Sequence, residues 1–83
     1  MSDIERVIDE YLREKLEITD DDDDYGIDLN LFDSGYLDSL GAMDLIVFVE
    51  SRFSVEISQK DITLYPMNSV SEIASVVERK MGA

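Results

Sequence analysis

The sequence predicts an all-α fold: a small antiparallel bundle of three main helices plus one short helix, with a long first loop. Three segments repeat their apolar residues with the period of an α-helix, and capping-box spacing precedes two of these segments. A length of 83 residues allows one small domain with a thin core, which we assign to residues 1–83.

The first main helix is predicted over residues 3–17. Ser2 and Glu5 have the spacing of a capping box at its start. A polar run at residues 19–24 follows the helix and contains five consecutive aspartates. The apolar residues of the helix form a single stripe: Ile4, Val7, Ile8, Tyr11, Leu12 and Leu16.

Residues 25–38 are predicted to form the long loop, because they keep no apolar period and contain Gly26, Asn30 and Gly35. A loop of this length is uncommon in so small a domain and usually has a function. We expect its apolar residues to hold it against the core: Ile27, Leu29, Leu31 and Phe32.

The second main helix is predicted over residues 39–53, and it carries more apolar residues than one buried face requires. One stripe has ordinary core spacing: Ala42, Leu45, Ile46, Val49 and Phe53. A second stripe lies nearly opposite and has carboxylates beside it: Leu40, Met43 and Val47, with Asp44 alongside and Glu50 at the edge. The other two main helices show one stripe each, so we interpret this second stripe as a docking surface for a partner with a basic rim. Coverage of the stripe by loop 25–38 is the alternative.

The remaining chain is predicted to form the short helix and the last main helix. Ser58 is placed to cap a short helical turn that Pro66 prevents from continuing. The last helix is predicted over residues 70–80, with Ser69 and Glu72 in capping-box spacing. Its expected buried stripe leaves Val76 to one side and consists of Val70, Ile73, Ala74, Val77 and Met81.

The composition excludes several classes of function. The chain has no cysteine and no histidine, which removes disulfides, thiolate and imidazole metal sites, and Ser-His-Asp catalysis. A net charge of −13 repels nucleic acids and anionic membrane surfaces and favours basic patches on other proteins. The acidic, amphipathic N-terminus is unlike a signal peptide, and no apolar run reaches membrane-spanning length. We therefore expect a non-enzymatic, cytoplasmic, monomeric protein that binds other proteins.

The aspartate run was compared with a calcium-binding EF-hand loop, which needs oxygen ligands at positions 1, 3 and 5, glycine at 6 and Glu at 12. Counting from Asp20 places Tyr25 at the glycine position. Counting from Asp21 places Gly26 there but Phe32 at the glutamate position. Neither register satisfies the motif, so we predict no metal ligands and interpret the run as a solvated, mobile segment.

Ser39 lies at the predicted start of the second main helix. Asp38 or Ser39 is expected to be its N-cap, because both residue types accept hydrogen bonds from the free amides there. The same position suits a covalently attached phosphate, since the helix dipole stabilises negative charge. A serine nucleophile is not supported, because the G-x-S-x-G turn is absent and no histidine is available to activate the hydroxyl.

The segment "LFDSGYLDSL" resembles the phosphopantetheine attachment region of the acyl and peptidyl carrier proteins. In that family a glycine, two further residues and then Asp-Ser-Leu open the second helix, as Gly35 and Asp38-Ser39-Leu40 do here. The likeness covers nearly the whole chain, from the first amphipathic helix to the last. It implies the acyl-carrier-protein-like helical fold.

The resemblance also implies a function, that of a stand-alone carrier whose chemistry belongs to its prosthetic thiol. A phosphopantetheinyl transferase would attach phosphopantetheine from coenzyme A to Ser39, and Asp38 would help that enzyme and its magnesium ion to engage the site. Leu40 completes the motif. The surface read by the transferase, by an acyl- or aminoacyl-loading ligase and by a downstream transferase or synthase would consist of Leu40, Met43, Asp44, Val47 and Glu50.

The cargo and a rival function remain open at this point. Carriers of fatty acid synthesis usually place an acidic residue after Asp-Ser-Leu, whereas this chain has Gly41. "DLNLFDSGYLDSLG" is more similar to the D-alanyl carrier proteins and to discrete carriers of secondary-metabolite pathways. The residues do not distinguish an acyl from an aminoacyl cargo. The rival function is a non-covalent acidic interaction module in which Ser39 is only a helix cap.

Overall fold

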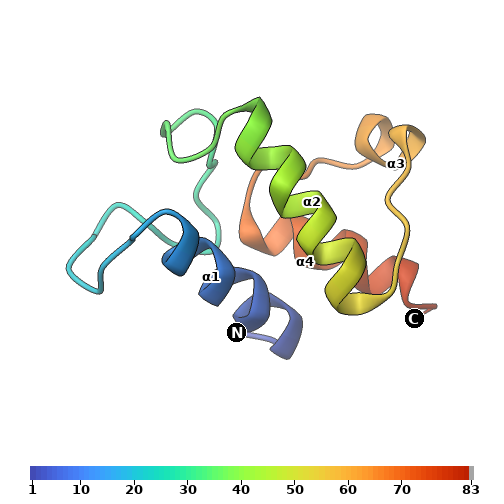
Figure 1. The fold of residues 1–83 in the computed structure, drawn as a ribbon, viewed down its shortest axis with the longest axis horizontal. Coiled ribbons are helices and arrows are strands. Elements are labelled where there is room, and N and C mark those ends of the chain that lie inside the picture. Colours follow the sequence, from blue (N-terminus) through green and yellow to red (C-terminus); the bar gives the residue numbers. More distant parts are fainter. Residues whose placement is uncertain (83) are drawn as a thin grey trace.

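The computed structural model describes residues 1–82, and its regular secondary structure over those residues is entirely helical. The elements are α1 (Asp3–Lys15), α2 (Ser39–Phe53), α3 (Gln59–Leu64) and α4 (Val70–Lys80). In Figure 1, α1 runs in the opposite direction to α2 and α4, and the short α3 lies apart at one end. The predicted fold class, three main helices plus a short one after a long first loop, is confirmed.

The start of α1 has the predicted capping box. The Glu5 amide donates to Ser2 Oγ at 3.1 Å, and the Ser2 amide donates to the Glu5 carboxylate at 2.8 Å. The helix ends at Lys15, two residues before the predicted end. It stops there because Glu17 adopts a left-handed backbone conformation with φ of 55°, which an α-helix does not accommodate.

The bounds of α4 agree with the prediction, but two expectations about its buried face were wrong. Met81 is 54% exposed because it lies beyond the last helical residue, where the stripe no longer faces the core. Val76 is 2% exposed although it lies off the stripe. It borders a small cavity formed with Tyr65 and Pro66, so the segment after α3 covers it.

The core is built from α1, α2, α4 and the long loop. Tyr11 of α1 stacks on Phe48 of α2, with ring centroids 4.1 Å apart. Burying these side chains supplies most of the stability of such a domain. The buried apolar residues of the cluster are Ile8, Leu12, Ile18, Tyr25, Leu31, Leu37, Leu45, Val49, Ile57, Val70, Ile73, Ala74 and Val77.

The long loop is tied to the start of α4 by backbone hydrogen bonds. The Leu31 amide donates to the Asn68 carbonyl at 2.7 Å, and the Ser71 amide donates to the Ile27 carbonyl at 2.9 Å. Leu31 is fully buried, as expected. Phe32 was predicted to pack against the core, but it is 38% exposed because its side chain borders an open groove instead.

The aspartate run is largely solvated, as predicted, and it contacts the rest of the protein through Asp22 and through an ion pair between Asp20 and Arg13 at 3.5 Å. Four of the five aspartates are exposed, whereas Asp22 is half-buried and accepts a hydrogen bond from Tyr36 Oη. Among residues 1–82, no group of three or more acidic side chains is arranged to hold a metal ion.

The segment that follows the aspartate run is joined to α1 through the buried side chain of Tyr25. Tyr25 donates to Asp9 at 2.7 Å, and Asp9 pairs with Arg13 at 3.0 Å. Burial of Tyr25 and its hydrogen bond to Asp9 raise the pKa of the phenol.

Within the described chain, no helix has the length and apolar character needed to cross a membrane.

Candidate functional site

Ser39 is the first residue of α2, and the N-cap is its neighbour Asp38. The Asp38 carboxylate accepts a hydrogen bond from the Gly41 amide at 2.8 Å, and the Asp38 carbonyl accepts one from the Ala42 amide at 2.9 Å. Of the two cap candidates, the structure selects Asp38. Ser39 is exposed to solvent, and its hydroxyl is not needed to cap the helix. The premise of the rival function, that Ser39 is the cap, is wrong.

A tight turn delivers the chain to Ser39. Gly35 has φ of 85°, a conformation that side chains rarely adopt, and its amide donates to the Phe32 carbonyl at 3.1 Å. After the turn, the Leu37 amide donates to the Leu31 carbonyl at 3.0 Å, and the Leu37 side chain is buried. The residues just before Ser39 are therefore held by the core while Ser39 itself faces solvent.

Gly41 allows Leu37 to lie close to the first turn of α2. A Cβ atom on Gly41 would lie 3.0 Å from Leu37 Cδ2 and 3.3 Å from the Asp38 carboxylate oxygen Oδ1. These distances are at the lower limit of real contacts. Close packing against Leu37 and Asp38 therefore accounts for a glycine at this position, where the fatty-acid carriers usually have an acidic residue.

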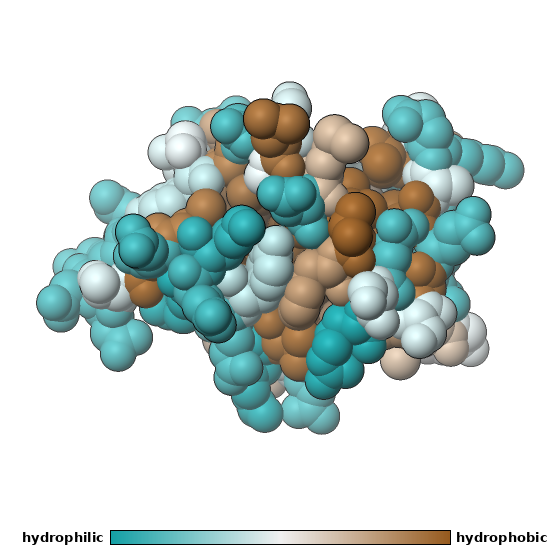
Figure 2. All heavy atoms as spheres, in the orientation of Figure 1, coloured by the Kyte–Doolittle hydropathy of each residue, from teal (hydrophilic) through white to brown (hydrophobic). Residues whose placement is uncertain are grey.

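The second apolar stripe of α2 faces solvent. Leu40, Met43 and Val47 are 74%, 64% and 63% exposed, so the loop at 25–38 does not cover them. Figure 2 shows apolar surface over α2, bordered by hydrophilic side chains. The face differs from the core stripe, where Leu45 and Val49 are buried.

The two carboxylates predicted to flank the stripe have different surroundings. Asp44 is exposed. Glu50 is half-buried, and its carboxylate accepts a hydrogen bond from the Ile57 amide at 2.8 Å. The Glu50 side chain thus satisfies a backbone donor in the connection between α2 and α3. Sequence spacing alone gave no signal of this internal contact.

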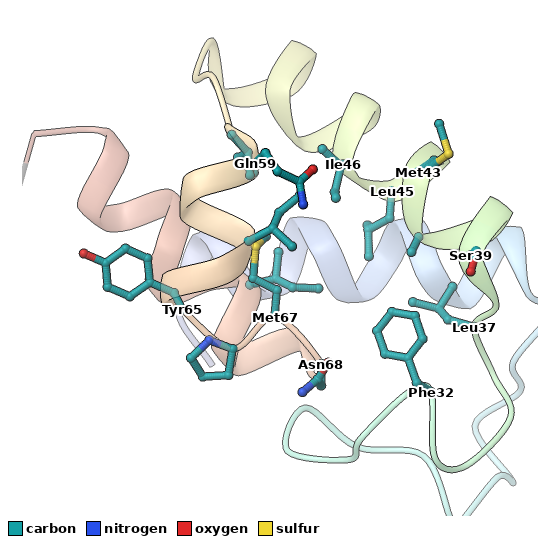
Figure 3. Close-up of a pocket in the computed structure, with 15 residues that line it drawn as sticks. Phe32, Leu37, Ser39, Met43, Leu45, Ile46, Gln59, Tyr65, Met67 and Asn68 are labelled. Carbon is teal, nitrogen blue, oxygen red and sulfur yellow. The ribbon is translucent and has the colours of Figure 1, made fainter.

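An apolar groove with a volume of about 440 Å³ begins beside Ser39. Figure 3 shows Phe32 and Leu37 at the end near Ser39, Met43 and Ile46 along α2, and Tyr65 and Met67 on the far side. Its walls come from the long loop, α2, α3 and the segment that follows α3. The groove could not be predicted from the sequence, because a helical period does not show which segments meet across a space.

The residues around Ser39 fit a phosphodiester. Ser39 and Leu40 have their amides before the first intrahelical hydrogen bond, where the positive end of the helix dipole lies. The first turn of α2 contains no acidic residue, and the neighbouring Asp38 carboxylate is bonded to the Gly41 amide. The apolar groove starts next to the hydroxyl, so a long arm attached there has protein surface to lie against.

Comparisons with known proteins point to a family of proteins that carry such an arm. A family model described as "Phosphopantetheine attachment site" matches residues 6–77. A D-alanyl carrier protein of Streptococcus suis (strain 05ZYH33) is 39% identical over 57 residues, which cover 69% of this chain and 72% of the relative. D-alanyl carrier proteins of Streptococcus pyogenes serotype M5 (strain Manfredo) and serotype M49 (strain NZ131) are 40% identical over 52 residues, 63% of this chain and 66% of each relative.

The family match covers most of the chain, from within α1 to within α4, and includes the turn described above. Its prosthetic group is phosphopantetheine. Such a chain is a carrier and not an enzyme, because the reactive group belongs to the prosthetic arm. The chain therefore belongs to the phosphopantetheine attachment family, and it is a carrier protein that tethers an acyl or aminoacyl group on a phosphopantetheine arm.

Proposed function

We propose that Ser39 carries the phosphopantetheine and that the tethered cargo is an aminoacyl group, D-alanine. The observation that carries the first part is the exposed Ser39 hydroxyl at the start of α2, next to a cap formed by a different residue. The proposal for the cargo follows the names of the relatives and the presence of Gly41 after Leu40.

The residues around the hydroxyl have separate roles in this proposal. Ser39 Oγ forms the phosphodiester, and the amides of Ser39 and Leu40 stabilise its negative charge. Asp38 caps the start of α2 in place of Ser39, so the Ser39 hydroxyl stays accessible to solvent. Asp38 also faces the transferase and its magnesium ion during attachment. When bound, phosphopantetheine supplies a thiol that holds the cargo as a thioester at the end of a long arm.

The exposed stripe of α2 is proposed as the surface that partner enzymes contact. Leu40, Met43 and Val47 form its apolar centre, and the exposed Asp44 provides charge at its edge for a basic rim. Glu50 contributes to this surface indirectly: its carboxylate accepts a hydrogen bond from the Ile57 amide and so positions the connection between α2 and α3. The partners are a phosphopantetheinyl transferase, a loading ligase and a downstream acceptor enzyme. The carrier meets them as a monomer in the cytoplasm, where coenzyme A and ATP are available.

The attachment site is tested by intact mass after incubation with coenzyme A and a broad-specificity phosphopantetheinyl transferase. Wild type should gain the mass of one phosphopantetheine group, and Ser39→Ala should gain none. Ser51→Ala, a second exposed serine of α2, is the matched control and should gain as wild type does. An equal gain on Ser39→Ala, or no gain on wild type, would overturn the assignment.

The cargo is tested on the modified carrier with ATP and a D-alanine-activating ligase. A D-alanyl thioester should form on wild type, detected by mass and released by hydroxylamine. Fatty-acyl loading by an acyl ligase is the comparison. Loading with the fatty acid and not with D-alanine would refute the proposed cargo while leaving the attachment site intact.

A further inference from the structure

The short helix α3 is anchored by a charge instead of an apolar face. Of its six residues, Asp61 is the one that is buried, at 7% exposure. Ile62 and Leu64 are 41% and 57% exposed. A six-residue helix is unstable by itself and normally depends on buried apolar contacts. Something other than a hydrophobic stripe therefore keeps α3 in place.

The partner of Asp61 is Lys80 in the last turn of α4. Lys80 Nζ lies 2.6 Å from an Asp61 carboxylate oxygen; the Asp61 side chain is 10% exposed and the Lys80 side chain 31%. The same carboxylate accepts hydrogen bonds from the amide and hydroxyl of Ser58, both at 2.9 Å. The Lys80 ammonium and the Ser58 amide lower the pKa of Asp61 to about 2, so the carboxylate is charged at neutral pH.

A second contact from α4 reaches the end of α3. The Arg79 guanidinium lies over the Tyr65 ring, 4.4 Å from its centroid. The connections on either side of α3 are held separately, by buried Ile57 before it and partly buried Met67 after it. In Figure 1, α3 projects from the bundle between two extended connections. The two ends of α3 are therefore held by contacts separate from the Asp61–Lys80 pair.

The position of α3 decides the shape of the groove beside Ser39. Gln59, Ile62 and Tyr65 line the groove on one side, and Met43 and Ile46 of α2 line it on the other. Figure 3 shows Gln59 and Ile46 approaching each other across it. A rotation of α3 would move one wall while the α2 wall stays with the core.

We propose that the Asp61–Lys80 ion pair is the latch that holds α3 as the movable wall of this groove, so that breaking the pair opens the groove. The pair joins the α3 wall to the end of α4, far along the chain from α2. It controls the groove without any contact to Ser39. Removing the Lys80 charge leaves the buried Asp61 carboxylate without its cationic partner, which is costly and favours exposure of that carboxylate.

The consequence for the arm rests on the proposed function. If Ser39 carries phosphopantetheine, the latch determines how much apolar surface is available to the arm and its cargo. The latch itself is a property of the unmodified chain, so it is tested without attachment. Failure of the latch experiment leaves the Ser39 assignment untouched, and failure of attachment leaves the latch untouched.

The test is hydrogen–deuterium exchange, read by mass spectrometry on the unmodified full chain. Lys80→Met keeps the length of the side chain and removes its charge. In this variant, amides of α3 and of its C-cap, such as those of Ile62 and Tyr65, should exchange about tenfold faster or more, while amides of α1 and the core of α2 keep their wild-type rates. Lys60→Met is the matched control on α3, since Lys60 is exposed, and it should exchange as wild type does.

A second readout follows the groove directly. N-phenyl-1-naphthylamine is a neutral fluorescent probe of apolar surface, so the net charge of −13 does not repel it. Its affinity for Lys80→Met should change at least threefold relative to wild type and to Lys60→Met, and Lys80→Arg should restore the wild-type value. If Lys80→Met destabilises the whole chain, the double variant Asp61→Asn/Lys80→Met removes the uncompensated charge and is measured instead.

Two results would overturn the proposal. One is an α3 exchange rate in the charge-free variants equal to that of the Lys60→Met control. The other is an equal acceleration in α1, α2 and α3, which would mean that the pair stabilises the bundle as a whole and does not act on α3 in particular.

Discussion

The two apolar stripes of α2 make opposite predictions for the same substitution. Val49 is fully buried, so Val49→Asp removes a buried side chain worth about 1.5–3 kcal/mol and places a carboxylate in the core. The carboxylate adds a cost of several kcal/mol. A domain of 83 residues has a total free energy of unfolding of about 4–12 kcal/mol. Val49→Asp should therefore remove most or all of the folded population.

Met43→Asp likewise replaces an apolar side chain by a carboxylate, but on the other stripe. Met43 is 64% exposed, so little apolar area is lost and the new carboxylate stays hydrated. We expect a loss below about 1 kcal/mol, typical of an exposed position. The functional loss should be larger, because the charge enters the apolar centre of the proposed docking surface.

The assay combines urea unfolding, followed by circular dichroism, with the rates of phosphopantetheine attachment and of cargo loading. Met43→Asp should keep the wild-type unfolding midpoint within the small loss above and slow at least one of the two enzymatic reactions. Val49→Asp should show little or no cooperative unfolding transition. If Met43→Asp destabilises the protein as strongly as Val49→Asp, or leaves both reactions at the wild-type rate, the assignment of the docking surface is wrong.

Two further predictions concern the first turn of α2 and the contact between Tyr36 and the aspartate run. Gly41→Ala should fail to give the usual gain of up to about 1 kcal/mol for replacing glycine inside a helix, because the new methyl would crowd Leu37 and the Asp38 cap; a thermal unfolding midpoint clearly above wild type would contradict this. The hydrogen bond to Asp22 and partial burial raise the pKa of Tyr36 to about 12 from an ordinary 10. The protonated Tyr36 phenol therefore contributes its full stabilisation of the folded state below pH 10, and this stabilisation is lost as the pH rises toward 12. In urea unfolding measured across that pH window, the free energy of unfolding of Tyr36→Phe should fall less than that of wild type. An equal fall with pH in the two proteins would argue against this prediction.

Local patterns predicted much of the helical structure because they act within one segment. The bounds of α4 and the separation of α2 into a buried and an exposed stripe follow from a period of 3.6 residues, which the surrounding chain did not override. The position of Ser39 followed in the same way from the start of α2. Such patterns describe the face of a helix and contain no information about the partner of that face.

The features that the sequence did not predict depend on contacts between distant segments. Val76 is buried by the segment after α3, and Glu50 is bonded to the Ile57 amide. Asp61 looks like an ordinary polar residue of a short helix until Lys80 is placed beside it. Each of these contacts requires the tertiary arrangement of the connections, where backbone direction and not periodicity decides which groups meet.

The hydrogen bonds between the long loop and α4 have a consequence for the order of assembly. Ser71 Oγ donates to Asp28 at 2.9 Å across a separation of 43 residues, beside the backbone bond from the Ser71 amide to Ile27. Closing a segment of that length costs entropy before any contact repays it, so these bonds form late in folding. The part of the long loop that leads into the turn before Ser39 is therefore fixed only when the last helix is in place.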